Sequence, residues 1–178
     1  MRIISGLNGG QKIIIPKNFN LRPTTDKSKE GIFNILSNYF DFYNVEVLDL
    51  FSGTGNMSYE FASRGAKYIR AVEINFKHYS FIKSEIKRMN LNIDVIKSDV
   101  FKYLNLNNDQ FDIIFADPPY NFDINKYELI IDKIFKLKIL NNHGLLIIEH
   151  SNKIELNNFK KYYQTRKYGG CYFSFFKT

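Results

Sequence analysis

The sequence predicts an α/β fold with a mainly parallel, seven-stranded sheet that ends in an antiparallel hairpin. From residue 45 onward, short apolar runs alternate with amphipathic segments, which is the pattern of repeated β–α units. Residues 160–167 and 171–177 then alternate in polarity around Gly169 and Gly170, which predicts a hairpin at one sheet edge. The 178 residues suit one domain over 1–178, with an extension in 1–40 and the sheet core in 41–178.

The extension is expected to begin with a small β-hairpin and to continue into a helix. Residues 2–5 and 12–15 form two short β-runs that are joined through a glycine-rich loop. Thr25 or Asp26 can cap the helix that follows. The side chains that this helix would bury are Ile32, Phe33, Ile35 and Leu36.

Five parallel strands and their connecting helices are expected in the core. The strands are predicted at 45–51, 68–74, 94–97, 111–116 and 144–149. Asn75 can cap the helix after the second strand, and Asp99 can cap a helical turn after the third. A further amphipathic helix follows the fourth strand. This succession is typical of Rossmann-like methyltransferases, whose parallel sheet carries an antiparallel edge.

Composition excludes several classes of protein. The chain is 44% hydrophobic and 24% charged, and it has neither an apolar run near the ~20 residues that cross a bilayer nor a signal-peptide core. A single cysteine, Cys171, excludes an internal disulfide, and His78, His143 and His150 are too scattered for a metal triad. We therefore expect a cytoplasmic protein that uses no metal and contacts no membrane.

A glycine turn follows the first core strand, and acidic residues stand at the ends of three successive strands. The turn consists of Phe51, Ser52, Gly53, Thr54 and Gly55. It lacks the third glycine of a dinucleotide site, and Asp49 before it would repel a pyrophosphate. Asp49 suits the cationic amino group of S-adenosylmethionine (SAM), Glu73 suits ribose hydroxyls, and Asp99 lies where adenine would bind. Each acid alone could be a helix cap or a solvated strand end, but together they predict a SAM site.

The tetrapeptide Asp117, Pro118, Pro119 and Tyr120 ends the fourth strand and is predicted to be catalytic. An exocyclic amine of a nucleobase is a poor nucleophile because its lone pair is delocalised into the ring. The Asp117 carboxylate and the Pro118 carbonyl can each accept one N–H and so aim the lone pair at a methyl group. Tyr120 offers a face on which a flipped base can stack. An inert Asp-Pro-Pro turn is the alternative.

The two ends of the chain carry the basic charge. The net charge is +7, and residues 1–30 hold six Lys and Arg against two acids, while residues 151–178 hold six against one. The central part is mildly acidic. This distribution suits a polyanion surface built from both ends, although a solvated lysine-rich surface would give the same totals.

The chain resembles the RsmD family of bacterial 16S ribosomal RNA guanine-N2 methyltransferases. The resemblance covers nearly the whole length and depends on the glycine turn, the Asp-Pro-Pro-Tyr tetrapeptide and two family-specific segments. These segments are Arg2-Ile3-Ile4-Ser5-Gly6 with Gly10 and Lys12, and Leu21-Arg22-Pro23-Thr24-Thr25-Asp26 with Glu30. Two residues depart from the family pattern: Lys29 replaces an arginine and Ser58 replaces a glycine.

The resemblance implies SAM-dependent methylation of the N2 amine of one guanine in 16S rRNA, within the small ribosomal subunit or an assembly intermediate, by a monomer. It implies nucleic-acid contacts through Arg2, Lys12, Arg22, Thr24 and Lys29. Three other functions use the same or related features: adenine-N6 methylation of DNA or RNA, RNA binding by a catalytically silent protein, and methylation of a protein glutamine. The last would use a related turn but gains nothing from basic chain ends. A sequence-specific DNA enzyme needs surface to recognise bases, and no segment here is long enough for a recognition domain.

Overall fold

The computed structural model describes residues 1–19 and 24–178, and over these residues helices and strands alternate as predicted. The elements are α1 (Asp26–Leu36), a 3-10 helix (Phe42–Asn44), β1 (Glu46–Leu50), α2 (Asn56–Ser63), β2 (Tyr68–Glu73), α3 (Phe76–Met89), β3 (Asp94–Lys97), α4 (Val100–Leu106), β4 (Phe111–Ala116), α5 (Ile124–Lys136), β5 (Leu140–His150), β6 (Tyr162–Tyr168) and β7 (Cys171–Lys177). Arg22 and its neighbours 20, 21 and 23 lie outside the described residues.

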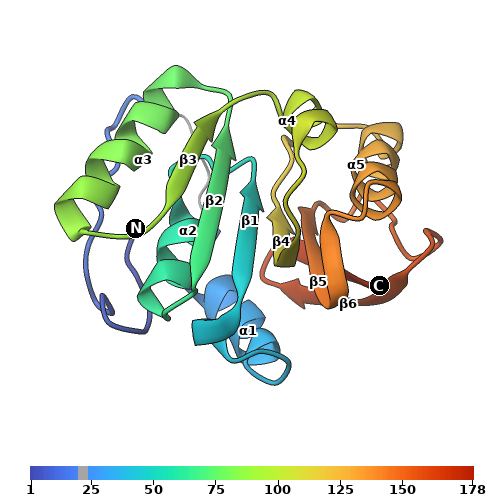
Figure 1. The fold of residues 1–178 in the computed structure, drawn as a ribbon, viewed down its shortest axis with the longest axis horizontal. Coiled ribbons are helices and arrows are strands. Elements are labelled where there is room, and N and C mark those ends of the chain that lie inside the picture. Colours follow the sequence, from blue (N-terminus) through green and yellow to red (C-terminus); the bar gives the residue numbers. More distant parts are fainter. Residues whose placement is uncertain (20–23) are drawn as a thin grey trace.

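The strands form one sheet in the order β3-β2-β1-β4-β5-β7-β6 (Figure 1). β1 to β5 pair in parallel, whereas β7 pairs antiparallel with both β5 and β6. This confirms the predicted fold class. β5 begins at Leu140 rather than at residue 144, because a register shift in its pairing with β4 admits exposed polar residues that interrupt the apolar pattern.

Helices cover both faces of the sheet, and apolar side chains alternate between the two layers. On β4, Ile113 and Phe115 pack toward α1, α2 and α3, while Ile114 and Ala116 pack toward α4 and α5. Successive side chains of a strand point to opposite faces, so a strand buried on both sides has a continuous apolar run. This explains why the central strands lack a polar face.

Three of the predicted helix caps are present. The Thr25 hydroxyl accepts the Ser28 N–H at 3.2 Å and begins α1. The Asn75 side chain accepts the Lys77 N–H at 2.8 Å, and the Asp99 carboxylate accepts the Lys102 N–H at 2.9 Å. Each cap satisfies a backbone donor that the first helical turn leaves unpaired.

The predicted N-terminal hairpin is reduced to one antiparallel bridge between Arg2 and Lys12. The segment is also held by α2, because the backbone N–H groups of Ile4 and Ser5 donate to the Glu60 carboxylate at 2.8 and 3.1 Å. Ile3 and Ile13 are buried in the core beside this contact. Backbone hydrogen bonds still join the two runs, from the Ile3 N–H to the Gln11 carbonyl at 3.0 Å and from the Ile13 N–H to the Met1 carbonyl at 2.9 Å, so the contacts with Glu60 add to a short antiparallel pairing.

The order of strands reverses between β1 and β4, which lie side by side at the centre of the sheet. The chain leaves β1 toward β2 and leaves β4 toward β5, so the loops after β1 and β4 diverge. In open α/β sheets, ligands bind beyond the carboxyl ends of the strands at such a switch point. Among the described residues, no helix is long and apolar enough to cross a membrane.

Candidate active site

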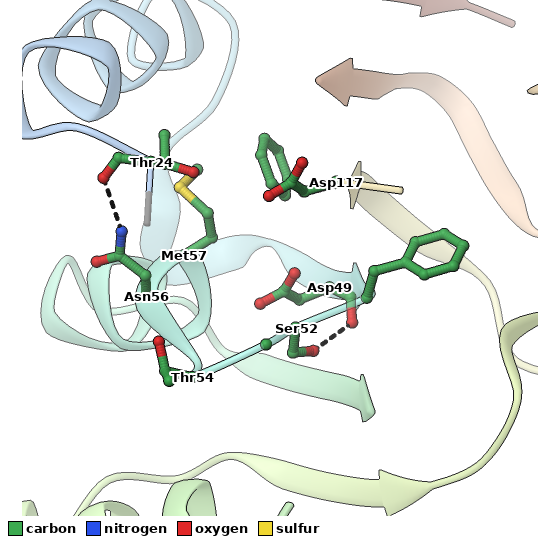
Figure 2. Close-up of a pocket in the computed structure, with 10 residues that line it drawn as sticks. Thr24, Asp49, Ser52, Thr54, Asn56, Met57 and Asp117 are labelled. Atoms are coloured by element: carbon green, nitrogen blue, oxygen red, sulfur yellow. Dashed lines mark hydrogen bonds between the residues drawn. The ribbon is translucent and has the colours of Figure 1, made fainter. Parts of the chain in front are cut away.

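Two adjoining cavities lie at the carboxyl ends of the strands, and Asp117 lines both of them. The smaller is lined by Thr24, Asp49, Phe51, Ser52, Gly53, Thr54, Asn56, Met57, Phe115 and Asp117 (Figure 2). The larger has a volume of about 730 Å³ and is lined by Phe51, Gly53, Val72, Glu73, Ile74, Asn75, His78, Asp99, Val100, Asp117, Pro118, Pro119, Tyr120 and Phe122. The structure thus brings together the predicted cofactor residues, apart from Gly55, with the predicted catalytic ones.

Asp49 is a buried acid in β1 beside the glycine turn. Its side chain is 2% exposed, and Oδ2 accepts hydrogen bonds from the Ser58 backbone N–H at 3.1 Å and from the Ser58 hydroxyl. Burial raises the pKa of Asp49 to about 7, against the opposing effect of these hydrogen bonds. Ser58 therefore stabilises the charged form of this acid.

The turn after β1 adopts left-handed backbone conformations. Phe51, Gly53 and Gly55 have φ values of 61°, 56° and 83°. At Gly55 a Cβ would lie 2.6 Å from the Tyr59 ring, so both conformation and packing require glycine there. Gly55 lines neither cavity, and its role is to begin α2 directly beneath the turn.

Glu73 ends β2 and holds the glycine turn from the side. Oε2 accepts the Gly53 N–H at 2.8 Å, and Oε1 accepts the Asn75 N–H at 2.7 Å. Each carboxylate oxygen can accept more than one hydrogen bond, so Glu73 retains capacity for a ligand hydroxyl in the larger cavity. His78 Nδ1 lies 3.7 Å from Oε1.

The far end of the larger cavity has aromatic walls that sequence reasoning missed. Phe122 packs edge-on against Phe51 at 5.7 Å between ring centroids and stacks with Phe101 at 6.2 Å. Asp99, which caps α4, lines the same cavity. His78 also lines it, although the sequence analysis gave it no site role. The position of Phe122 just after the tetrapeptide was its only sequence signal.

The tetrapeptide after β4 presents its acid to both cavities. Pro118 is buried and Asp117 is partly buried, whereas Tyr120 is 55% exposed at the rim. Among the described residues, the Asp117 carboxylate accepts no hydrogen bond, so its oxygens are available to a substrate donor. Burial, followed by the negative charges of Glu149 and Asp49, raises the pKa of Asp117 well above its ordinary value.

The predicted nucleic-acid residues divide into exposed and buried groups. Lys12 is exposed, and Arg2 is exposed and paired with Asp26 at 2.7 Å. Thr24 is buried and lines the smaller cavity, so it belongs to the pocket wall. The prediction for Arg22 falls outside the described residues.

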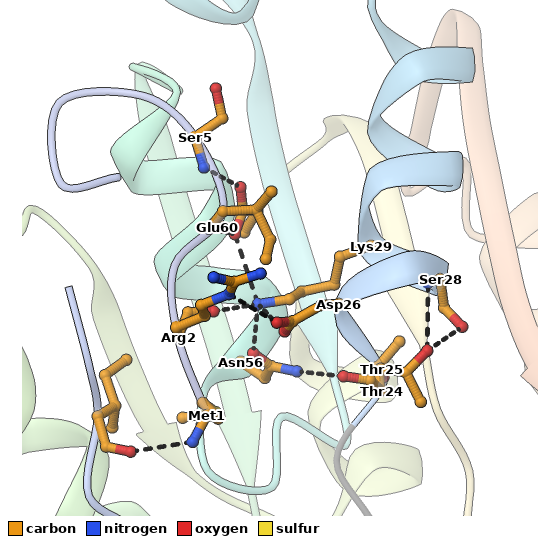
Figure 3. A network of polar contacts seen from close by, with 12 residues as sticks. Met1, Arg2, Ser5, Thr24, Thr25, Asp26, Ser28, Lys29, Asn56 and Glu60 are labelled. Carbon is orange, nitrogen blue, oxygen red and sulfur yellow. Dashed lines mark hydrogen bonds and ion pairs between the residues drawn. The ribbon is translucent and has the colours of Figure 1, made fainter. Parts of the chain in front are cut away.

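Lys29 differs from its predicted role because its side chain is only 1% exposed. It lies in a network of polar contacts with Arg2, Asn56 and Glu60 (Figure 3). Its Nζ donates to the Arg2 carbonyl and to Asn56 Oδ1, the latter at 3.0 Å, and lies 3.5 Å from Glu60. A buried ammonium must be paired and hydrogen-bonded, and the lowered pKa of Lys29 results chiefly from its burial. Its cation ties α1, α2 and the N-terminal segment together and is not accessible to an RNA phosphate.

Comparisons with known proteins show which family the chain belongs to. The family described as Conserved hypothetical protein 95 matches residues 1–177. Ribosomal RNA small subunit methyltransferase D of Buchnera aphidicola subsp. Acyrthosiphon pisum is 35% identical over 153 residues, which cover 85% of this chain and 78% of that protein. The protein of the same name in subsp. Baizongia pistaciae is 34% identical over 155 residues, which cover 86% and 78%.

Solved structures share the fold. A hypothetical protein of Thermus thermophilus superposes with a TM-score of 0.87 at 22% identity, covering 100% of this chain and 99% of that one. The 16S rRNA N2 methyltransferase RsmC of T. thermophilus, solved with AdoMet and guanosine, superposes with a TM-score of 0.68 at 19% identity, covering 89% of this chain and 44% of that one.

Within the described residues, no group of three side chains that could hold a metal ion is found. Because the family match spans nearly the whole length, the chain belongs to the RsmD family of ribosomal RNA small subunit methyltransferases.

Proposed function

We propose that this chain transfers a methyl group from SAM to the exocyclic N2 amine of one guanine in 16S rRNA of the small ribosomal subunit. The observation that supports this most directly is the position of Asp117. Its carboxylate, with no hydrogen bond from the described residues, lies at the junction of a cofactor-sized cavity and a smaller polar pocket at the sheet's switch point.

The residues at this edge fit SAM. Asp49 is a buried acid suited to the cationic amino group, and Glu73 retains hydrogen-bond capacity for ribose hydroxyls. The aromatic wall at Phe122 suits the adenine ring, with Asp99 nearby for its amino group. The solved relative RsmC, which shares this fold, was crystallised with the same cofactor.

Asp117 and Pro118 are suited to activate an amine. SAM, when bound, supplies a methyl group on a sulfonium sulfur: the N–C bond forms as the S–C bond breaks, the electron pair stays on sulfur, and the nitrogen loses one proton. The Asp117 carboxylate and the Pro118 carbonyl accept the two N–H groups and direct the lone pair at the methyl carbon. Such alignment contributes up to ~7–11 kcal/mol in well-oriented reactions.

Several features support an RNA substrate. Tyr120 is exposed beside Asp117, where a flipped base could stack on its ring for ~1–3 kcal/mol. Lys12 and Arg2 place positive charge on the N-terminal segment 1–40, which we assign to RNA binding, while 41–178 forms the catalytic core. The relatives in Buchnera are named as small-subunit rRNA methyltransferases. We further propose that the chain works in the cytoplasm as a monomer on the subunit or its assembly intermediate.

The test is methylation of small subunits that lack the modification, with labelled SAM and mass mapping of the modified nucleotide. We expect one N2-methylguanine in 16S rRNA. Asp117→Ala should lower kcat by about 10²–10⁴-fold because it removes an N–H acceptor and the proton acceptor, while SAM affinity measured by calorimetry stays within a few-fold. Methylation of an adenine, or full activity of Asp117→Ala, would contradict the proposal.

A further inference from the structure

Glu149 is a buried carboxylate at the end of β5 that sequence reasoning did not identify as a site residue. Its side chain is 3% exposed, and Oε2 accepts a hydrogen bond from the Thr24 hydroxyl at 3.0 Å. The register pairs Ala116 of β4 with Ile148 of β5, so Asp117 and Glu149 follow paired residues on neighbouring parallel strands. Side chains at equivalent positions of adjacent strands lie on the same face, which places the two acids beside each other.

Polar contacts from α1 and α2 hold Thr24 in place. The Thr24 carbonyl accepts Asn56 Nδ2 at 3.0 Å, and Asn56 Oδ1 accepts Lys29 Nζ at 3.0 Å (Figure 3). All three residues are buried, and Lys29 is anchored further by the Arg2 carbonyl and Glu60. The direction of the Thr24 hydroxyl toward Glu149 is therefore set by a continuous buried network.

The groups that face Asp117 come from several elements. Asp49 lies on β1 and Glu149 on β5, and Tyr127 of α5 and Tyr120 of the same loop border the cluster. After burial, the charge of Glu149 is the larger of the two electrostatic causes that raise the pKa of Asp117. A like charge close by disfavours ionisation and so makes a carboxylate more basic.

On the basis of the proposed function, we propose that Glu149 is a positioning residue for methyl transfer: the Thr24 hydroxyl holds its carboxylate beside Asp117, which accepts the proton that leaves the methylated amine. That proton passes from nitrogen to Asp117 and then to solvent, so no additional reactant is needed. A general base works best when its pKa lies near the working pH. Glu149 acts through Asp117 and does not itself contact the reacting atoms.

The test is the pH profile of kcat/KM for Glu149→Gln, which removes the charge but keeps the shape. Activity requires ionised Asp117, so it is present above the pKa of Asp117 and is lost as the pH falls through it. Removing the charge of Glu149 removes one cause that raises this pKa. We therefore expect the acid limb to move to lower pH by about one unit and the plateau of kcat to fall several-fold.

Matched variants separate this effect from damage to the fold. Thr24→Val removes the hydroxyl that stabilises the charge of Glu149 and should move the acid limb in the same direction, whereas Thr24→Ser should leave the limb in place. Asp112→Asn removes a carboxylate at the opposite end of β4, where it accepts the Glu46 N–H and the Asn141 amide at 2.8 Å each. This control should not move the limb.

The outcomes distinguish the two proposals. An unshifted limb in Glu149→Gln, with Asp117→Ala inactive, overturns the role of Glu149 and leaves the proposed function intact. An equal shift in Asp112→Asn also overturns it, because the effect would then be a general one of lost charge. Full activity of Asp117→Ala overturns the proposed function itself. If circular dichroism shows that Glu149→Gln is unfolded, the pH profile of Thr24→Val replaces it. An acid limb that moves to lower pH supports the role of Glu149, and an unmoved limb overturns it.

Discussion

At the scale of single residues, burial decides which charges are available to the site. Asp49 and Asp117 both have raised pKa values, and desolvation is the first cause for each. They differ in their partners: Asp49 is held by Ser58, while Asp117 accepts no hydrogen bond from the described residues. The first arrangement suits a fixed acid that binds a cation, and the second suits an acid that exchanges protons with a substrate.

The raised pKa of Asp49, about 7, predicts that SAM affinity depends on pH. A bound cationic amino group favours the ionised acid, so below pH 7 binding must first remove a proton. We expect the Kd to fall by up to about tenfold per unit as the pH rises from about 5.5 toward 7, and then to level off. Calorimetric titration would measure this, and Asp49→Asn should bind more weakly with a flat profile. The same slope in Asp49→Asn would assign the titration to another group.

At the scale of elements, α2 supports both the cofactor turn and the N-terminal extension. Its first residues follow Gly55, and its Glu60 and Ser63 bind the backbone of residues 4–8. The close approach is most demanding at Gly6, which has φ +86° and where a Cβ would lie 1.9 Å from the Ser63 carbonyl oxygen. A change on one side of α2 can therefore affect the other.

Gly6→Ala should lower the free energy of unfolding by about 2 kcal/mol, because the added methyl group must push the segment away from α2. Gly10→Ala is a matched control, since Gly10 has a similar φ of +82° but open space around its Cβ. Gly10→Ala should lower the free energy of unfolding by about 1 kcal/mol, because it introduces the backbone strain of a positive φ without a steric clash. Urea unfolding measures both. Equal losses would show that contact with α2 adds nothing to the cost of the turn.

At the scale of the whole molecule, some basic side chains of the N-terminal segment are buried in the protein and others are exposed on its surface. The Lys29 ammonium group is buried inside the protein, where its contacts with Asn56 and Glu60 join α1 to α2. Lys12 and Arg2 remain exposed. Because the buried charges of Lys29 and Glu60 cancel each other, the exposed cations of the segment are the ones that can contact a polyanion.

Lys12→Gln should weaken RNA binding and reduce the slope of log K against log salt by about one, because one phosphate contact and its released counterion are lost. Lys136→Gln is the control, since Lys136 lies at the end of α5 and pairs with Asp132 at 2.7 Å. Filter binding at several salt concentrations measures the slope. Identical slopes in Lys12→Gln and the unmodified chain would remove this part of the extension from the RNA surface.

The sequence by itself determined the features that depend on local pattern. Strand and helix positions, the caps Thr25, Asn75 and Asp99, and the strand-end acids follow from the spacing of neighbouring residues, and the parallel sheet then gathers the strand ends at one edge. Only the tertiary structure decided that Lys29 is buried and that Glu149 lies beside Asp117. These facts depend on contacts between segments up to 125 residues apart, as in the Thr24–Glu149 hydrogen bond, and no local periodicity encodes such a distance.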